Sequence, residues 1–213
     1  AGFIQGPGFS AAGRQIPSQQ GIGDTLPRWI NIEESSFGAL VTTKDELLNE
    51  IRNEVKDGVD LIKIAGSGPG TTEWGAFRLE ELELAVDEAH RLGRPLAIHA
   101  RSRQSAADAV AAGVDWIMHA SYMDLPTLDL AIEKGIPFVP AMTLLVNSLE
   151  SGTMAAAAKD AMQRELDAAV SILSKAYQQG ATLVAGSESG FAMTPYGEWH
   201  TREMELFVSY LGM

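Results

Sequence analysis

Short apolar runs alternate with amphipathic stretches from about residue 40 to the end of the chain. Between the runs, apolar residues recur at the three- and four-residue spacing of a helix face. The predicted strands are residues 59–65, 96–98, 116–118, 136–142 and 181–185, and the predicted helices are residues 43–57, 79–92, 104–112, 124–134, 153–179 and a last one from about 201. Strict alternation of strand and helix predicts a parallel α/β architecture.

Signals at the ends of the helices agree with this pattern. Thr43 and Glu46 form a capping box, Asp124 is placed to cap the helix that follows it, and glycine comes after nearly every predicted helix. Residues 1–38 are rich in Gly, Pro, Ser and Gln and predict a long loop, with one short strand near residues 2–5. Loops of this length inside a domain are usually functional or disordered.

The strand count limits the architecture. Five clear strands and one doubtful one, with short connections, suit either a doubly wound sheet or part of a (β/α)8 barrel. A full barrel takes roughly 250 residues, and this chain has 213. We therefore expect residues 1–213 to form one incomplete (β/α)8 TIM barrel, with strands about three to eight of the eight. The first barrel strand or strands, and any flanking β-sandwich, would then lie outside these residues.

Polar residues stand where four of the predicted strands end. His99 and His119 close two successive strands, Lys63 lies within the run DLIKIA, and Glu188 lies in the turn after the last strand. In α/β proteins this edge of the sheet carries the chemistry. The two imidazoles could share a metal ion, or each could simply be satisfied at a strand–loop boundary. A carboxylate at Glu188 could ligate the metal and accept a proton from water.

Lys63 has three competing interpretations, because an ammonium group is costly in an apolar strand. Its amine could reach the strand end or pair with Asp60. Alternatively, desolvation could free the amine as a Schiff-base nucleophile. Thirdly, the neutral amine could add carbon dioxide and become a carbamate, an anionic ligand able to bridge two metal ions. Only the third interpretation accounts for His99 and His119 at the same edge.

The composition and charge of the chain limit the kinds of molecule that it can bind. The chain is 46 % hydrophobic with a formal net charge of −12, which argues against a nucleic acid or an anionic membrane and favours a small-molecule substrate. No apolar run approaches the roughly 20 residues of a membrane span. The sequence has no cysteine, so a metal must be held by histidines, carboxylates or modified side chains, for which zinc is the default. The sequence does not indicate in which cellular compartment the protein works.

Several segments together resemble one known family. They are GVDLIKIAGSG, ELELAVDEAHRLGRPLAIHA, AADAVAAGVDWIMHASYMD, AIEKGIPFVPAM and VAGSESG, and they cover nearly the whole chain from Leu40 on. The pattern resembles the metal-dependent amidohydrolase superfamily, most closely its imidazolonepropionase-like and prolidase-like branch. The resemblance implies an amidohydrolase-type barrel with one or two divalent ions. The implied ligands are His99, His119, Glu188 and a carboxylated Lys63.

The resemblance also implies a substrate pocket. Its lining would include Tyr122, Met142, Thr143 and Tyr196, with Arg14 near it. Three departures from the family stand out. No HxH pair occurs in this chain, Glu188 stands where the family has aspartate, and Tyr196-Gly197 stands where it often has His-Gly.

The expected function is metal-dependent hydrolysis of an amide-like C–N bond, with Glu188 and Lys63 as catalytic residues. The expected cofactors are zinc or another divalent ion and the carbon dioxide-derived carbamate. A dipeptide or N-acyl amino acid is the first substrate class, and an aryl-urea or carbamate the second. Two alternatives stay open: a Schiff-base lyase or aldolase using Lys63, and a catalytically impaired barrel with a binding role. A homo-oligomer, and an upstream segment that completes the barrel, are further possibilities.

Overall fold

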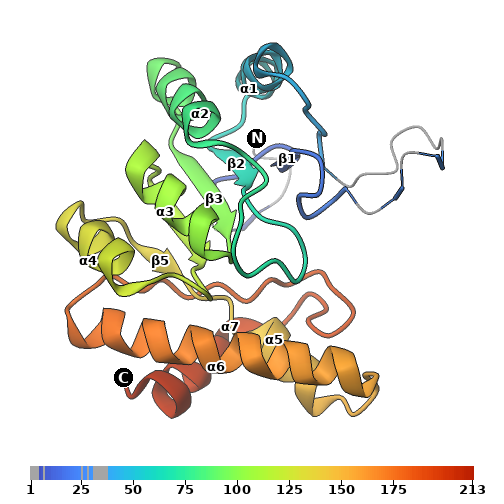
Figure 1. Cartoon of the computed structure of the whole chain (residues 1–213), viewed down its shortest axis with the longest axis vertical. Coiled ribbons are helices and arrows are strands. Elements are labelled where there is room, and N and C mark those ends of the chain that lie inside the picture. The colour runs from blue at the N-terminus through green and yellow to red at the C-terminus, as the bar shows by residue number, and fades with distance from the viewer. Residues whose placement is uncertain (1–4, 7, 25, 28, 31–37) are drawn as a thin grey trace.

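Five strands form one parallel sheet in the order in which they occur along the chain. The computed structural model describes residues 5–6, 8–24, 26–27, 29–30 and 38–213. The strands, side by side in Figure 1, are β1 (Ile16–Pro17), β2 (Ile62–Ala65), β3 (Leu96–Ala100), β4 (Trp116–His119) and β5 (Phe138–Val139). Beyond β5, Leu183 makes an isolated parallel bridge with Phe138.

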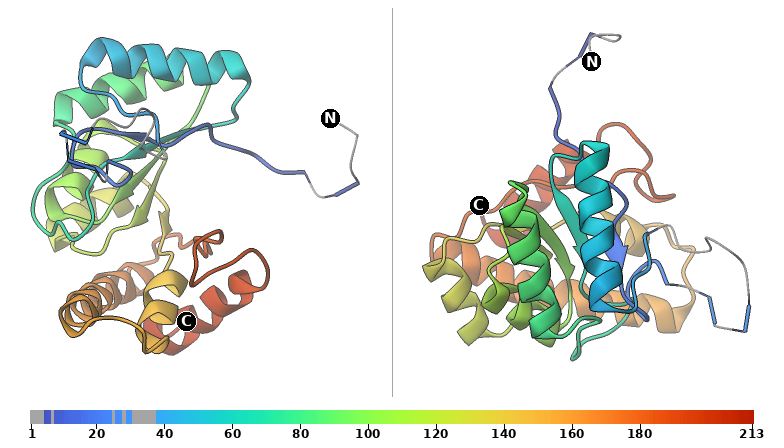
Figure 2. Two further views of the ribbon diagram at one scale, coloured as in Figure 1. Left: turned by 90° about the vertical axis from the view of Figure 1, so that its right-hand side faces the viewer. Right: turned by 90° about the horizontal axis from the view of Figure 1, so that it is seen from above.

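At least one helix follows each strand along the chain. They are α1 (Lys44–Asp57), α2 (Leu79–Arg91), α3 (Arg103–Ala112), α4 (Leu125–Glu133), α5 (Thr143–Glu150), α6 (Ala156–Gln178) and α7 (Trp199–Leu206), with a π-helical turn η1 (Phe207–Leu211). Helices α1 to α4 lie side by side along one face of the sheet, and α5, α6 and α7 gather beyond β5 (Figure 2). A doubly wound sheet has helices on both faces and reverses its strand order. In the described part of the chain, the helices lie on one face and the strand order does not reverse, so the sheet is an incomplete (β/α)8 barrel, as predicted.

The two faces of the sheet differ in burial. In-register neighbours on the outer face are fully buried against the helices: Ile62, Ile64, Leu96, Ile98 and Ile117. On the inner face, Lys63, Trp116, Met118 and Val139 are only half-buried, whereas Ala97 and His99 of β3 are buried. The apolar core therefore lies between sheet and helices, while the inner face of the partial barrel is partly exposed at β2, β4 and β5.

The predicted helix signals are confirmed. Thr43 and Glu46 form the capping box of α1, and the Asp124 side chain accepts from the Thr127 amide at the start of α4. Gly58 ends α1 with a left-handed backbone, at φ of 91°. Among the described residues, no helix is both long and apolar enough to cross a lipid bilayer.

Several predicted boundaries were wrong. The run 136–142 gives a strand of only two residues, because Pro137 and Pro140 flank it and neither can donate a ladder hydrogen bond. The run 181–185 pairs only through Leu183, and the first predicted strand begins at Ile62 rather than residue 59.

Two elements were missed, and one prediction cannot be compared. Helix α5 occupies a stretch where no helix was expected, and α6 starts at Ala156 instead of residue 153. Strand β1, which is only two residues long, was also missed. The predicted strand near residues 2–5 falls mostly on residues 2–4, which lie outside the described part of the chain.

A buried carboxyl group on α1 makes the fold sensitive to pH. Glu54 is 5 % exposed, and neither carboxylate oxygen has a hydrogen-bond partner. A Cβ at Gly13 would come within 2.6 Å of that carboxylate, so glycine lets the chain pass closely over it. Burial, together with the nearby charge of Glu50, raises the pKa of Glu54 to about 7, although Arg14 opposes the shift.

Glu54→Gln is therefore expected to stabilise the protein at pH 8. Because the folded state holds the Glu54 proton more tightly than the unfolded state, wild-type stability falls as pH rises from about 4.5 to about 7. The variant should lack this loss and be more stable by about 2 kcal/mol at pH 8. Urea unfolding at pH 5 and pH 8 measures the difference. The exposed Glu83→Gln is the control, and an unchanged pH dependence in Glu54→Gln would contradict the prediction.

Candidate metal centre

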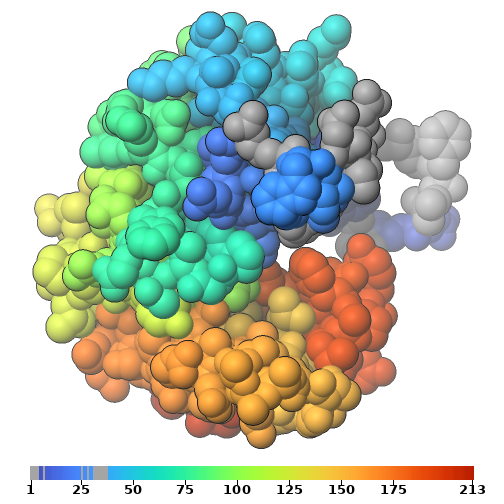
Figure 3. All heavy atoms as spheres, turned by 45° about the vertical axis from the view of Figure 1, so that its right-hand side comes forward, coloured from blue at the N-terminus to red at the C-terminus, as the bar shows by residue number. Residues whose placement is uncertain are grey.

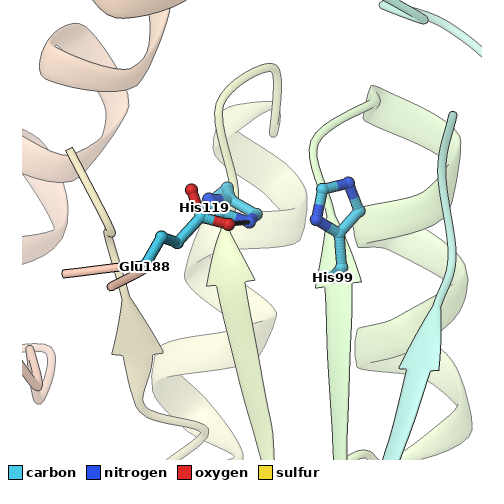
Figure 4. Close-up of side chains that lie close together, drawn as sticks. All are labelled: His99, His119 and Glu188. Atoms are coloured by element: carbon cyan, nitrogen blue, oxygen red, sulfur yellow. Dashed lines mark ion pairs between the residues drawn. The ribbon is translucent and has the colours of Figure 1, made fainter. Parts of the chain in front are cut away.

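Two histidines meet at the carboxyl ends of neighbouring strands. His99 lies on the inner face of β3, whereas strict alternation would put His119, the partner of Ala100, on the outer face. A left-handed backbone at His119, with φ of 73°, breaks the alternation. The two rings consequently lie edge to face with their centroids 4.6 Å apart, and both residues are 3 % exposed (Figure 4).

Glu188 completes the cluster from the segment that follows Leu183. Its Oε1 lies 3.4 Å from His119 Nε2 (Figure 4). The residue has a left-handed backbone, at φ of 49°, and its carbonyl accepts a 2.7 Å hydrogen bond from the buried Thr194 hydroxyl. The turn thus holds a non-glycine residue in a conformation that is normally unfavourable.

The cluster fits a divalent ion. One ligand atom from each of His99, His119 and Glu188 lies within 4.8 Å of the others. Ligands bound at about 2 Å from one ion lie up to about 4 Å apart, so small side-chain rotations suffice. His99 Nε2, His119 Nδ1 and Glu188 Oε2 are buried without hydrogen-bond partners. Such orphaned atoms are rare in proteins, and here all three could turn a lone pair toward a cation.

The electrostatics of the cluster also suit a cation. Burial, reinforced by the charges of Arg101 and Lys63, holds the pKa of His99 and His119 well below the usual range. Both imidazoles are therefore neutral, the form that binds metals. Burial raises the pKa of Glu188, although Arg101 and Lys63 oppose the shift.

Lys63 lies within electrostatic reach of the same three residues. Burial of its amine lowers its pKa to about 8, with the charge of Glu188 opposing the shift. A group with that pKa is uncharged in about one molecule in ten at pH 7. Its Nζ contacts the Met118 sulfur, a weak acceptor. The Asp60 carboxylate instead accepts from the Ala11 amide, which does not support the interpretation that pairs Lys63 with Asp60.

The structure adds charged residues that the sequence analysis missed. Arg101 follows the end of β3 and lies between Glu188 and Glu165, a residue of α6 that also binds Ser121. The one signal in the sequence was the position of Arg101, two residues after His99. Nothing local marks Glu165, which is 64 positions away from Arg101.

Two of the predicted pocket residues hold the turn after β5. Met142 and Thr143 are fully buried, and their amides donate to the Glu203 carboxylate of α7 at 2.9 and 2.8 Å. The Thr143 hydroxyl donates to the same carboxylate at 2.5 Å. Glu203 is a third residue that the sequence analysis missed. Contact of Met142 and Thr143 with substrate stays a prediction.

The other predicted pocket residues are spread out. Tyr122 is half-buried next to Ser121, and burial raises the pKa of its phenol. Tyr196 is 89 % exposed, with its hydroxyl close to Gly190. Arg14 is not brought to the cluster, because its guanidinium donates to the Gly38 carbonyl at 2.6 Å.

Figure 3 shows the loop after β2 (teal) and the segment after Leu183 (red) on either side of a hollow in the surface.

Comparison with known proteins agrees with this geometry. The Amidohydrolase family matches the chain over residues 6–197. Ochratoxinase from Aspergillus niger is 26 % identical over 163 residues, which cover 68 % of this chain and 34 % of that protein. Its crystal structure superposes with a TM-score of 0.85 at 24 % identity, covering 99 % of this chain and 52 % of the other.

A second solved structure is similarly close. A Xaa-Pro dipeptidase with methionine bound in its active site gives a TM-score of 0.79 at 26 % identity, covering all of this chain and 54 % of the other. The chain therefore spans about a third of the matched ochratoxinase sequence and about half of each of these solved chains.

Proposed function

The chain belongs to the amidohydrolase family, and on that premise we propose that it carries the metal site of a hydrolase of amide-like C–N bonds. The observation that supports this most directly is the convergence of His99, His119 and Glu188, with three buried atoms that lack hydrogen-bond partners. Each residue ends a different strand segment, so the convergence arises from the fold and not from one local motif. The proposed substrate is a small molecule.

We assign a role to each residue of the site. His99, His119, Glu188 and carboxylated Lys63 would hold the divalent ion, most often zinc for nitrogen and oxygen ligands. When bound, the ion makes water more acidic and polarises a carbonyl group. Glu188 would accept the proton from the attacking water and deliver it to the leaving nitrogen. Its raised pKa, caused by burial, brings the carboxyl group closer to neutral pH, where a general base works best.

Dipeptides and N-acyl amino acids are the first substrates to test. One similar solved structure is a Xaa-Pro dipeptidase, so Xaa-Pro dipeptides lead the panel. Aryl-ureas and carbamates form the second class. We further propose that a segment outside these residues closes the open inner face and supplies the missing HxH pair, since the chain spans about half of its solved relatives. We also propose, separately, that the protein forms a homo-oligomer, which gel filtration would test.

The deciding experiment is removal and restoration of the metal. The full-length protein should contain a divalent ion by elemental analysis and hydrolyse a member of the substrate panel. A chelator should abolish the activity, and zinc plus bicarbonate should restore it. His99→Asn should lose the metal, whereas His200→Asn, a change of an exposed histidine on α7, should keep it. A metal content below about 0.2 ion per chain, against the expected one ion or more, would favour a binding role.

Lys63 supports one competing function. A buried amine with a pKa of about 8 could also form a Schiff base with a carbonyl substrate. Borohydride would then trap a covalent adduct on Lys63, and chelation would leave the activity unchanged. Trapping together with chelator resistance would replace the hydrolase proposal with the lyase or aldolase.

A further inference from the structure

Arg101 lies between two carboxylates but binds them unequally. Its Nη1 donates to Glu165 Oε1 at 2.7 Å, whereas its Nη2 lies 3.6 Å from Glu188 Oε2. The first contact is a charge-assisted hydrogen bond, and the second is too long to be one. Glu188 Oε2 accordingly stays buried without a hydrogen-bond partner. The guanidinium is therefore committed to Glu165 rather than to the candidate metal ligand.

The position of Glu165 is fixed from two sides. The residue belongs to α6, is 8 % exposed, and also accepts a 3.1 Å hydrogen bond from the Ser121 hydroxyl. Ser121 is buried, two residues after His119. Helix α6 packs against α4 and α5, which leaves Glu165 little freedom. The Arg101–Glu165 pair is thus a rigid, largely desolvated ion pair at the edge of the cluster.

Without Glu165, the same guanidinium would have one obvious new partner. Arginine forms bidentate pairs with carboxylates, and a buried unpaired charge is costly. Arg101 would therefore close the 3.6 Å gap and occupy Glu188 Oε2. A carboxylate paired in this way competes poorly for a cation.

We propose that Glu165 is a positioning residue that holds Arg101 off Glu188, and so keeps the Glu188 carboxylate free to bind the divalent ion. This inference rests on the proposed function, because it assumes that Glu188 is a metal ligand. Glu165 itself touches neither the ion nor the substrate. Partners of this kind, one contact away from the ligands, typically contribute 10- to 100-fold to metal affinity.

Zinc binding to the metal-free full-length protein tests the proposal. Titration by calorimetry, with a competing chelator, should show that Glu165→Gln binds zinc about 10- to 100-fold more weakly than wild type. The double variant Arg101→Met/Glu165→Gln removes the competing guanidinium and should regain wild-type affinity to within about threefold. Ser121→Ala, which loosens Glu165 without removing its charge, should weaken binding by a smaller factor. Glu150→Gln breaks an exposed pair with Arg202 and should change nothing.

Two results would overturn the inference. A double variant as weak as Glu165→Gln would mean that Glu165 supports the fold rather than restrains Arg101. A crystal structure of metal-free Glu165→Gln in which Arg101 has not moved toward Glu188 would be equally decisive, and it needs no metal. If wild type fails to bind zinc while Arg101 does move, the proposed function fails and the restraint on Arg101 stands.

Discussion

Glu188→Gln is expected to lower kcat by about 100- to 10,000-fold, the usual contribution of a general base. The amide is nearly the same size, so the turn held by Thr194 should persist. It cannot accept a proton from water, and it is a poorer ligand for a divalent ion. Steady-state kinetics on the best substrate of the panel, with zinc content measured in parallel, separate loss of the base from loss of the metal.

The matched comparison is Glu188→Asp, the residue that the family resemblance implies at this position. Shortening the side chain by one methylene should draw the carboxylate away from His119, now 3.4 Å from it, and a displacement of about 1 Å can cost 100-fold in rate. We therefore expect Glu188→Asp to be slower than wild type. A rate equal to or above wild type would mean that the left-handed backbone at Glu188 does not serve the longer side chain.

Glu203→Ala is expected to destabilise the protein by about 3 kcal/mol. Its carboxylate accepts from two amides and one hydroxyl in the turn that starts α5, and α5 has no side-chain cap of its own. Removing the carboxylate leaves those donors buried and unsatisfied. For a protein of this size the loss corresponds to a fall in Tm of about 6–12 °C, which differential scanning calorimetry would measure.

Glu205→Ala on the same helix is the control for Glu203. Its carboxylate is exposed and pairs only loosely with Arg202, at 3.6 Å, so its removal should change stability by no more than about 0.5 kcal/mol. Equal effects of the two substitutions would show that helix α7, rather than its link to the turn after β5, sets the stability.

The position of the candidate site could be predicted from sequence because it depends on periodicity. His99, His119 and Glu188 each follow an apolar run, and parallel strands bring such positions to one edge. Lys63 was identifiable because a lysine inside an apolar strand is unusual. Helix ends were predictable for the same local reason, since capping involves residues three positions apart.

Contacts between distant segments could not be predicted. Glu165 meets Arg101 across 64 positions, and Glu203 meets Thr143 across 60, and neither glutamate differs locally from a solvent-facing helix residue. The backbone conformation could not be predicted either, because nothing in the amino-acid sequence indicates that the backbone at His119 is left-handed. The two-residue strands fall below the length at which alternation can be detected.

Left-handed backbone at residues other than glycine is concentrated around the site. His119, Ala120, Ala141 and Glu188 all have positive φ, and each such residue typically costs about 1–3 kcal/mol. This conformational cost lowers the stability of the protein in the region of the candidate metal site. If the proposed function is right, variants of these positions that relax the backbone should gain stability and lose metal affinity.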